Sequence, residues 1–128
     1  MTSKDRNRIA LAIAQAERGT SGRIAVRVLH ESNVDAFERA KREFELAGLH
    51  RHETGNAALI LIAPKARSFA VIGDAALHER VGDEFWQLVA DDMRSHFAYG
   101  KMADGVVAGV ERIGEALQTH FAEEATGP

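Results

Sequence analysis

The sequence has 128 residues, a formal net charge of −3 and an isoelectric point near 6.1, so one domain with a core of its own is expected. The slightly acidic balance argues against a nucleic-acid partner, which requires a basic surface with interleaved aromatic side chains. The chain contains no cysteine, which excludes disulfides, thiolate metal ligands and a cysteine nucleophile.

No segment has the pattern of a membrane span or of a secretory signal. Crossing a bilayer takes about 20 consecutive apolar residues, and no apolar run approaches that length. The apolar positions near the start of the chain are interrupted by Gln15, Glu17 and Arg18, which does not fit a secretory signal. We therefore expect no membrane span and a cytoplasmic location.

The first predicted elements are a helix over residues 3–18 and a strand over residues 23–28. Apolar side chains recur at helical spacing at Ile9, Ala12, Ile13 and Ala16. Thr2 or Ser3 can cap the start of this helix, and Gly19 suits its end. After a turn over residues 20–22, alternating side chains have the period of a strand.

A second helix is predicted to start at residues 32–35 and to end at Gly48. A polar loop over residues 49–56 follows it. Residues 57–63 form an unbroken apolar run, which is typical of a strand covered on both faces. A turn of hairpin length over residues 64–67 then leads to a third strand over residues 68–72.

Two further apolar stripes predict two closing helices. They comprise Phe85, Leu88, Val89, Met93 and Phe97 in the first helix, and Met102, Val106, Val110, Ile113 and Leu117 in the second. Gly105 and Gly109, one turn apart, predict close packing of the second helix. The order α-β-α-β-β-α-α predicts an α/β fold, a three-layer α/β/α sandwich around a small mixed sheet. We expect a single domain over residues 1–122 and a frayed tail over residues 123–128.

Three blocks of the sequence resemble the TPM domain family. Residues 20–26, Thr-Ser-Gly-Arg-Ile-Ala-Val, are similar to its turn into the first strand, and residues 55–63 and 67–73 are similar to its hairpin, which ends in glycine. Residues 97–105 resemble its approach to the last helix. The blocks occur in the family's order and span about residues 5–118.

The resemblance implies an α/β/α fold, in a family known from bacteria and thylakoid lumens. It also implies one of two activities, because members have been described as phosphatase-like with a divalent cation bound by acidic residues, or as accessory factors for membrane complexes. The chain departs from the family in two respects. We expect neither the signal peptide nor the membrane anchor that many members carry, and Gly73-Asp74-Ala75 stands where Gly-Tyr-Gly is common.

The segment over residues 73–84, expected to be an acidic loop, is the candidate site. Oxygen ligands suit Ca²⁺ or Mg²⁺, and four carboxylates offer them, namely Asp74, Glu79, Asp83 and Glu84. His78 could transfer a proton near neutral pH, so the catalytic candidates are Asp74, His78 and Asp83. Arg80 or Arg23 could neutralise a phosphoryl group. If the third strand is antiparallel to the first, Asp74 lies at the opposite end of the sheet from residues 29–31.

A structural explanation of these residues is favoured over a catalytic one. Asp83 and Glu84 suit the start of a helix, and Asp74 can cap a short turn through Leu77. His50 and His52 lack the further ligands that zinc requires, so a solvated loop is expected there. Ser21 lacks a nucleophile elbow and is interpreted as a turn residue.

Two functions follow from these observations. The first is a soluble, stand-alone TPM-like domain that acts as a binding or accessory module through a protein partner. The second is a weak phosphatase that uses the acidic segment 73–84 with Ca²⁺ or Mg²⁺ as its cofactor. A structural subunit is a third class, but no apolar surface patch in the sequence supports it.

Overall fold

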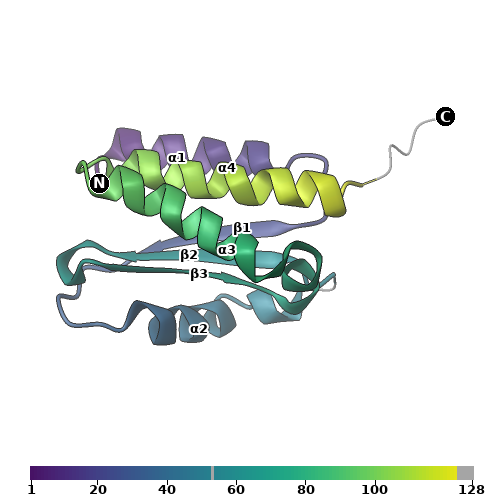
Figure 1. Ribbon diagram of the computed structural model, residues 1–128, viewed down its shortest axis with the longest axis horizontal. Helices are drawn as coiled ribbons and strands as arrows, with labels where there is room; N and C mark the ends of the chain where they lie inside the picture. Colours follow the sequence, from purple (N-terminus) through teal and green to yellow (C-terminus); the bar gives the residue numbers. More distant parts are fainter. Residues whose placement is uncertain (53, 124–128) are drawn as a thin grey trace.

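Three strands form a mixed sheet in the computed structural model, which describes residues 1–52 and 54–123 (Figure 1). They are β1 (Arg23–Val28), β2 (Ala57–Ala63) and β3 (Ser68–Gly73), in the spatial order β1-β2-β3. β1 runs parallel to β2, and β3 runs antiparallel to it. The parallel pair requires a crossover, and the segment that contains the second helix provides it.

Helices cover both faces of the sheet (Figure 1). α2 (Ala36–Leu46) packs on one face, whereas α3 (Ala75–Phe97) and α4 (Met102–His120) lie on the other. α1 (Ser3–Glu17) packs beside α4 in the same outer layer. The α/β fold and the predicted order α-β-α-β-β-α-α are therefore confirmed. None of the helices within the described residues is both long and apolar enough to span a membrane.

β2 is the centre of the core, because all of its residues are buried. Side chains alternate between the two faces of a strand. Leu59 and Leu61 pack in the cluster around α2, while Ile60 and Ile62 pack in the cluster formed with α3 and α4. Burial of each such side chain contributes roughly 1.5–3 kcal/mol. The strand predicted over residues 57–63 is confirmed with the same bounds.

α1 and α4 run side by side in the same direction (Figure 1). Near their starts, Arg8 Nη2 and Asp104 Oδ1 are 2.7 Å apart. Further along, a Cβ placed on Gly114 would lie 2.6 Å from the Cβ of Ala16 and 2.9 Å from its Cα. The backbones of the two helices therefore approach each other as closely as small residues allow.

Glycines also bring α4 close to α3. A Cβ on Gly105 would lie 2.5 Å from Cε1 of Phe97, and one on Gly109 would lie 2.7 Å from Sδ of Met93. The close packing predicted for Gly105 and Gly109 is confirmed.

The loop predicted over residues 73–84 is wrong, because α3 already begins at Ala75. Asp74 is the N-cap of this helix, and its Oδ1 accepts a hydrogen bond of 2.8 Å from the Ala75 amide. The helix bends at Gly82, which has φ 78° and ψ 172°, a conformation that only glycine adopts readily. A capped and kinked helix therefore takes the place of the expected loop.

The first turn of α3 is fixed by a contact that is distant in sequence. The carbonyl of Gly55 accepts hydrogen bonds from the amides of Ala76, at 3.0 Å, and Leu77, at 3.2 Å. Leu77 is fully buried in the core. The segment before β2 therefore helps to start α3, which no local sequence pattern reveals.

Several other boundaries differ slightly from the prediction. α1 ends at Glu17 and α2 ends at Leu46, each shortly before its predicted end. α2 begins at Ala36 because Asp35 caps it, accepting hydrogen bonds from the amides of Phe37 and Glu38. β3 extends to Gly73, one residue beyond the predicted strand. Two 3-10 helices, η1 (Leu49–Arg51) and η2 (Pro64–Ala66), occupy the loops on either side of β2.

The segment after α4 is tied to the turn before β1. The amide of Glu123 donates a hydrogen bond of 2.8 Å to the carbonyl of Gly19, and Ala122 forms a bridge with Thr20. The rest of the expected tail, residues 124–128, lies outside the described residues.

Candidate functional site

Side chains from three loops meet where β1 and β2 begin and β3 ends. Strand pairing places Arg23 opposite Ala57 and Ala58 opposite Gly73, so these three strand ends lie in a row. The row brings together Ser21, His52, Thr54, Asn56 and Asp74, and we call this group the amino edge. As expected for an antiparallel third strand, Asp74 lies at the opposite end of the sheet from residues 29–31.

Asn56 holds the amino edge together from inside. Its side chain is 0 % exposed, and its Nδ2 donates a hydrogen bond of 2.9 Å to the hydroxyl oxygen of Ser21. Its Oδ1 accepts a hydrogen bond from the hydroxyl of Thr54. A buried amide with both ends paired fixes the loops on either side of it, because breaking either bond would leave a buried polar group unpaired.

His52 fixes the backbone of the same turn. Its Nε2 lies 2.6 Å from the carbonyl oxygen of Ser21. A carbonyl can only accept, so Nε2 carries a proton, and in the neutral ring Nδ1 is the atom left to accept a hydrogen bond. The Ser21 hydroxyl accepts from Asn56, which leaves its own proton for a ligand.

The predicted metal ligands are spread along α3. Asp74 is half-buried at the N-cap, whereas Glu79 and Glu84 are exposed further along the helix. Asp83, just after the kink, has a 95 % exposed side chain. Within residues 1–52 and 54–123, no group of three or more His, Asp or Glu side chains is arranged to hold a metal ion.

His78 forms a small hydrogen-bonded group with Trp86 and Asp83. The indole Nε1 of Trp86 donates to Nδ1 of His78 at 3.0 Å, so this ring nitrogen is unprotonated. The proton of the neutral ring is therefore on Nε2, which lies 3.4 Å from Oδ1 of Asp83. Trp86 reaches this position because Gly73 has no Cβ, which would overlap the indole ring. The structure thus brings together His78 and Asp83, and it adds a tryptophan to them.

The two arginines considered for phosphoryl binding are not part of this group. Arg80 is exposed and lines a hollow between α3 and α4 together with Arg112 and His120. Arg23 is exposed at the start of β1.

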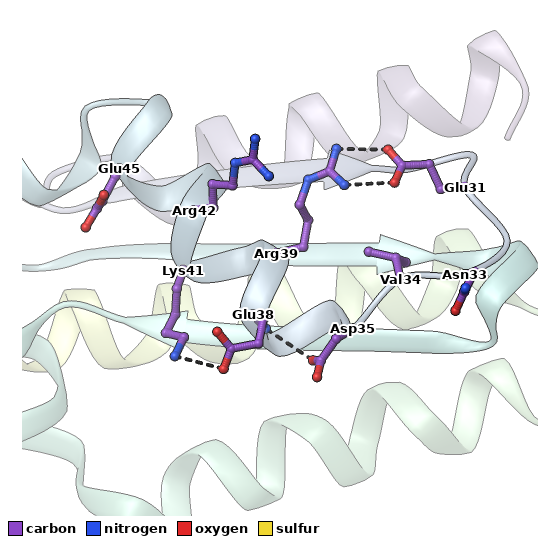
Figure 2. A pocket seen from close by; sticks show the side chains of 9 residues that line it. All are labelled: Glu31, Asn33, Val34, Asp35, Glu38, Arg39, Lys41, Arg42 and Glu45. Atoms are coloured by element: carbon purple, nitrogen blue, oxygen red, sulfur yellow. Dashed lines mark hydrogen bonds and ion pairs between the residues drawn. The ribbon is translucent and has the colours of Figure 1, made fainter.

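A hollow of about 720 Å³ lies elsewhere, over α2 and the loop before it (Figure 2). Arg39 donates to both carboxylate oxygens of Glu31, at 2.8 and 2.9 Å, and Lys41 lies 3.0 Å from Glu38. The bond from Arg39 holds the pKa of Glu31 below its usual range, and Glu31 raises the pKa of Arg39. Because these opposite charges satisfy each other, the hollow offers little net charge to a ligand.

Sequence reasoning missed Asn56, His52 and Trp86 as parts of the site. An asparagine directly before an unbroken apolar strand was a usable signal, since a polar residue there is drawn toward the core and needs partners. Trp86 lies 13 positions after Gly73 in the chain. The spacing of apolar residues within one helix or strand does not predict that these two residues touch.

Comparisons with known proteins agree on one family. A family model described as the TPM domain matches residues 1–116. The NMR structure of the BA42 protein from the psychrophilic bacterium Bizionia argentinensis has a TM-score of 0.88 and 30% sequence identity, covering 98% of this chain and 86% of that one. No functionally curated protein matches the chain.

Two solution structures at lower identity share the fold. The N-terminal domain of the cg2496 protein from Corynebacterium glutamicum has a TM-score of 0.75 at 17% identity, covering 100% of this chain and 81% of that one. The N-terminal domain of a protein from P. gingivalis has a TM-score of 0.80 at 15% identity, with coverage of 99% and 83%. With the family match over nearly the whole sequence, the chain belongs to the TPM domain family.

Proposed function

We propose that this TPM domain is a binding module whose ligand-facing surface is the amino edge. The observation that carries the proposal is the fully buried Asn56, bonded to Ser21 and Thr54. A network of this kind holds loop side chains in place before a ligand arrives, which reduces the entropy lost on binding. The amino edge is therefore a preorganised polar surface on a rigid sheet.

The chemistry of the amino edge favours a ligand with positive charge or hydrogen-bond donors. Asp74 is half-buried, and one of its carboxylate oxygens accepts from the Ala75 amide. The other oxygen remains an acceptor, and in the neutral His52 ring Nδ1 is a second one. A cation or a basic group of a protein partner suits such acceptors.

Ca²⁺ and Mg²⁺ are the probes that test this proposal. In a ¹H–¹⁵N NMR titration with CaCl₂ or MgCl₂, we expect shift changes around residues 20–22, 54–56 and 74–77. Asp74→Asn should abolish them, because an amide still caps a helix but lacks the charge. Asp35→Asn, the same change at the cap of α2, is the matched control and should leave the titration unchanged. Shifts that persist in Asp74→Asn, or none at all, would contradict the proposal.

A second candidate function is a divalent-cation-assisted phosphatase, and the group around His78 favours it. Because Trp86 fixes the ring, Nε2 of His78 bears the proton beside Asp83 and could give it to a leaving alkoxide oxygen. The carboxylate of Asp83 beside it is an oxygen donor that suits a hard cation, which would neutralise the charge of a phosphoryl group when bound. Binding at the amino edge remains the first proposal, since its buried network stands without any metal.

Hydrolysis of β-glycerophosphate, whose leaving group is an alkoxide that needs a proton, tests the second candidate in the presence of MgCl₂. We expect His78→Gln to reduce the rate by at least about a hundredfold, the usual contribution of an acid–base group. His50→Gln, in a loop outside this group, serves as the control and should keep the full rate. If hydrolysis survives both His78→Gln and the double change Asp74→Asn with Asp83→Asn, the activity belongs to a contaminant and this candidate fails.

A further inference from the structure

A second cavity lies at the end of the sheet opposite the amino edge. It measures about 660 Å³ and lies where β2 ends, where β3 begins and where α3 connects to α4. Its lining includes Ile62, Ala63, Phe69, Phe97 and Met102. In open α/β sheets, ligands bind beyond the carboxyl ends of the parallel strands, and the carboxyl end of β2 borders this cavity. Its volume is within the range of small-molecule sites.

The lining of the cavity is apolar and partly aromatic. Phe69 and Phe97 meet edge to face, with ring centroids 5.1 Å apart, and both are only partly buried. Met102 adds a flexible apolar side chain that can adapt to the shape of a ligand. An aryl or aliphatic group would therefore complete the packing of these side chains.

Two arginines give the cavity a positive rim. Arg94 places its guanidinium carbon 5.5 Å from the centre of the Phe69 ring, and its Nη1 donates to Asp91 at 2.9 Å. A guanidinium has five N–H donors, so one bond to Asp91 leaves others available. Arg67 also lines the cavity.

Arg67 occupies a position where glycine would be the relaxed choice. It has φ 49° and ψ 44°, and it is the only residue other than glycine with positive φ among those the structure describes. This left-handed conformation ends the Pro64–Ala66 turn of the β2–β3 hairpin. Side chains disfavour it, and such strained residues gather at binding sites. An arginine at this position therefore points to a use for its side chain.

We propose that this cavity binds a small amphiphilic carboxylate, with its apolar body against Phe69 and Phe97 and its carboxylate between Arg67 and Arg94. Guanidinium groups pair with carboxylates through two parallel hydrogen bonds, which supplies recognition of the head. The apolar lining supplies recognition of the body. This site shares no residue with the amino edge, so it stands or falls independently of the function proposed above.

Sodium 4-phenylbutyrate is the probe, titrated into the ¹⁵N-labelled protein. We expect shift changes confined to residues 62–69 and 94–102. Arg67→Gly should weaken binding about tenfold, the value of one charge-assisted hydrogen bond pair, while the fold is kept because glycine suits the turn. Asp91→Asn should have the opposite effect on affinity and tighten binding, because the carboxylate that competes for Arg94 is gone.

Three controls make the test decisive. Lys65→Ala removes a cation from the same turn without touching the cavity lining and should leave the affinity unchanged. Ala98→Trp places a large ring on a lining residue and should block binding. 4-Phenylbutanol, which lacks the charged head, should bind at least about tenfold more weakly.

The proposal is overturned if phenylbutanol binds as well as phenylbutyrate, or if the shifts map to the amino edge. It is also overturned if millimolar phenylbutyrate causes no shift, or if a peptide with a free C-terminal phenylalanine binds and phenylbutyrate does not. In that last case the cavity would recognise the end of a protein chain.

Discussion

Asn56 connects two loops through its side chain, and its partner Ser21 lies 35 residues earlier in the chain. Removing the amide would leave the hydroxyls of Ser21 and Thr54 without their buried partner. We expect Asn56→Ala to lower the free energy of unfolding by about 2–3 kcal/mol, because unpaired buried polar groups cost about 1–3 kcal/mol each. Urea unfolding of the purified protein measures the loss.

Asn33→Ala is the matched control for that experiment. Asn33 is an exposed asparagine before α2, and the change should alter the free energy of unfolding by less than about 0.5 kcal/mol. A loss in Asn56→Ala as small as this would mean that the network does not hold the amino edge together.

Arg67 offers a test of backbone strain that is separate from ligand binding. Replacing it by glycine relieves the left-handed conformation, which costs an L-residue about 1–2 kcal/mol. Part of this gain is offset by the greater freedom of glycine in the unfolded chain. We expect Arg67→Gly to raise the free energy of unfolding by about 0.5–1 kcal/mol, whereas Arg67→Ala, which keeps the strain, should not. A rise in both variants would assign the effect to the lost charge instead.

At the scale of elements, the contact between α1 and α4 depends on Gly114. A methyl group there would meet the Cβ and Cα of Ala16, and Cα cannot move aside as a flexible side chain can. Overpacking costs about 1–3 kcal/mol, partly offset by the higher helix propensity of alanine. Gly114→Ala should therefore reduce the stability, as measured by urea unfolding.

Gly109→Ala makes the same change in the same helix, but next to the flexible side chain of Met93. Its new methyl group would meet Sδ of Met93, which can adopt another rotamer. We expect a smaller loss than in Gly114→Ala. The reverse order would show that the rigidity of the neighbour does not decide the cost.

The kink of α3 depends on Gly82 and positions Trp86, the single tryptophan of the chain. Its backbone conformation is open almost only to glycine, so Gly82→Ala should cost about 1–3 kcal/mol. The intrinsic fluorescence should also change, because a straightened helix moves the indole away from His78. Gly48→Ala, at a left-handed position that L-residues can adopt, should cost less and leave the fluorescence unchanged.

Local patterns were sufficient for the elements whose signals lie within a few residues. The bounds of β2 follow from its unbroken run of apolar residues. The close packing of Gly105 and Gly109 follows from their helical spacing. Each of these signals lies within the segment itself. The start of α3 could not be found in this way, because the carbonyl of Gly55 completes its first turn from a distant loop. The interpretation of Asp74 as a cap was right, although the helix it starts is much longer than one turn.

In the candidate site too, some residues could be selected from the sequence and others depend on contacts that only the fold creates. Asp74 and His78 could be selected from the sequence because their residue types carry chemistry near a predicted strand end. Asn56 could be noticed as a polar residue directly before an apolar strand, but its partner Ser21 could not be identified, because only the parallel pairing of β1 and β2 brings Ser21 near.

For the molecule as a whole, three carboxyl groups should make the stability depend on acid pH. The Thr2 amide, which donates to Asp5, lowers the pKa of that carboxyl. A bond from Arg8 lowers the pKa of Asp104, and one from Arg39 lowers that of Glu31. A carboxyl group whose pKa is lower in the folded than in the unfolded state stabilises the fold at pH values above its unfolded pKa. This contribution is lost as the pH falls through the pKa of the folded state.

We therefore expect the melting temperature to fall as the pH decreases below about 4, near the ordinary pKa of carboxyl groups. In Asp104→Asn the decrease should be shallower, because one of the titrating contacts is already absent. Glu111→Gln, at an exposed carboxyl on the same helix, should follow the unmodified protein. Thermal melts followed by circular dichroism between about pH 7 and about pH 3 measure the difference. Parallel curves for Asp104→Asn and the unmodified protein would contradict this assignment.

The pairing of α1 with α4 sets the order in which the molecule can be completed on the ribosome. Arg8 and its partner Asp104 are separated by 96 positions, so the first helix leaves the exit tunnel long before its neighbour is translated. Until then only α2 and α3 can cover the sheet, and the apolar stripe of α1 lacks the helix it packs against. A nascent chain that stalls before residue 102 would therefore keep that stripe exposed to water.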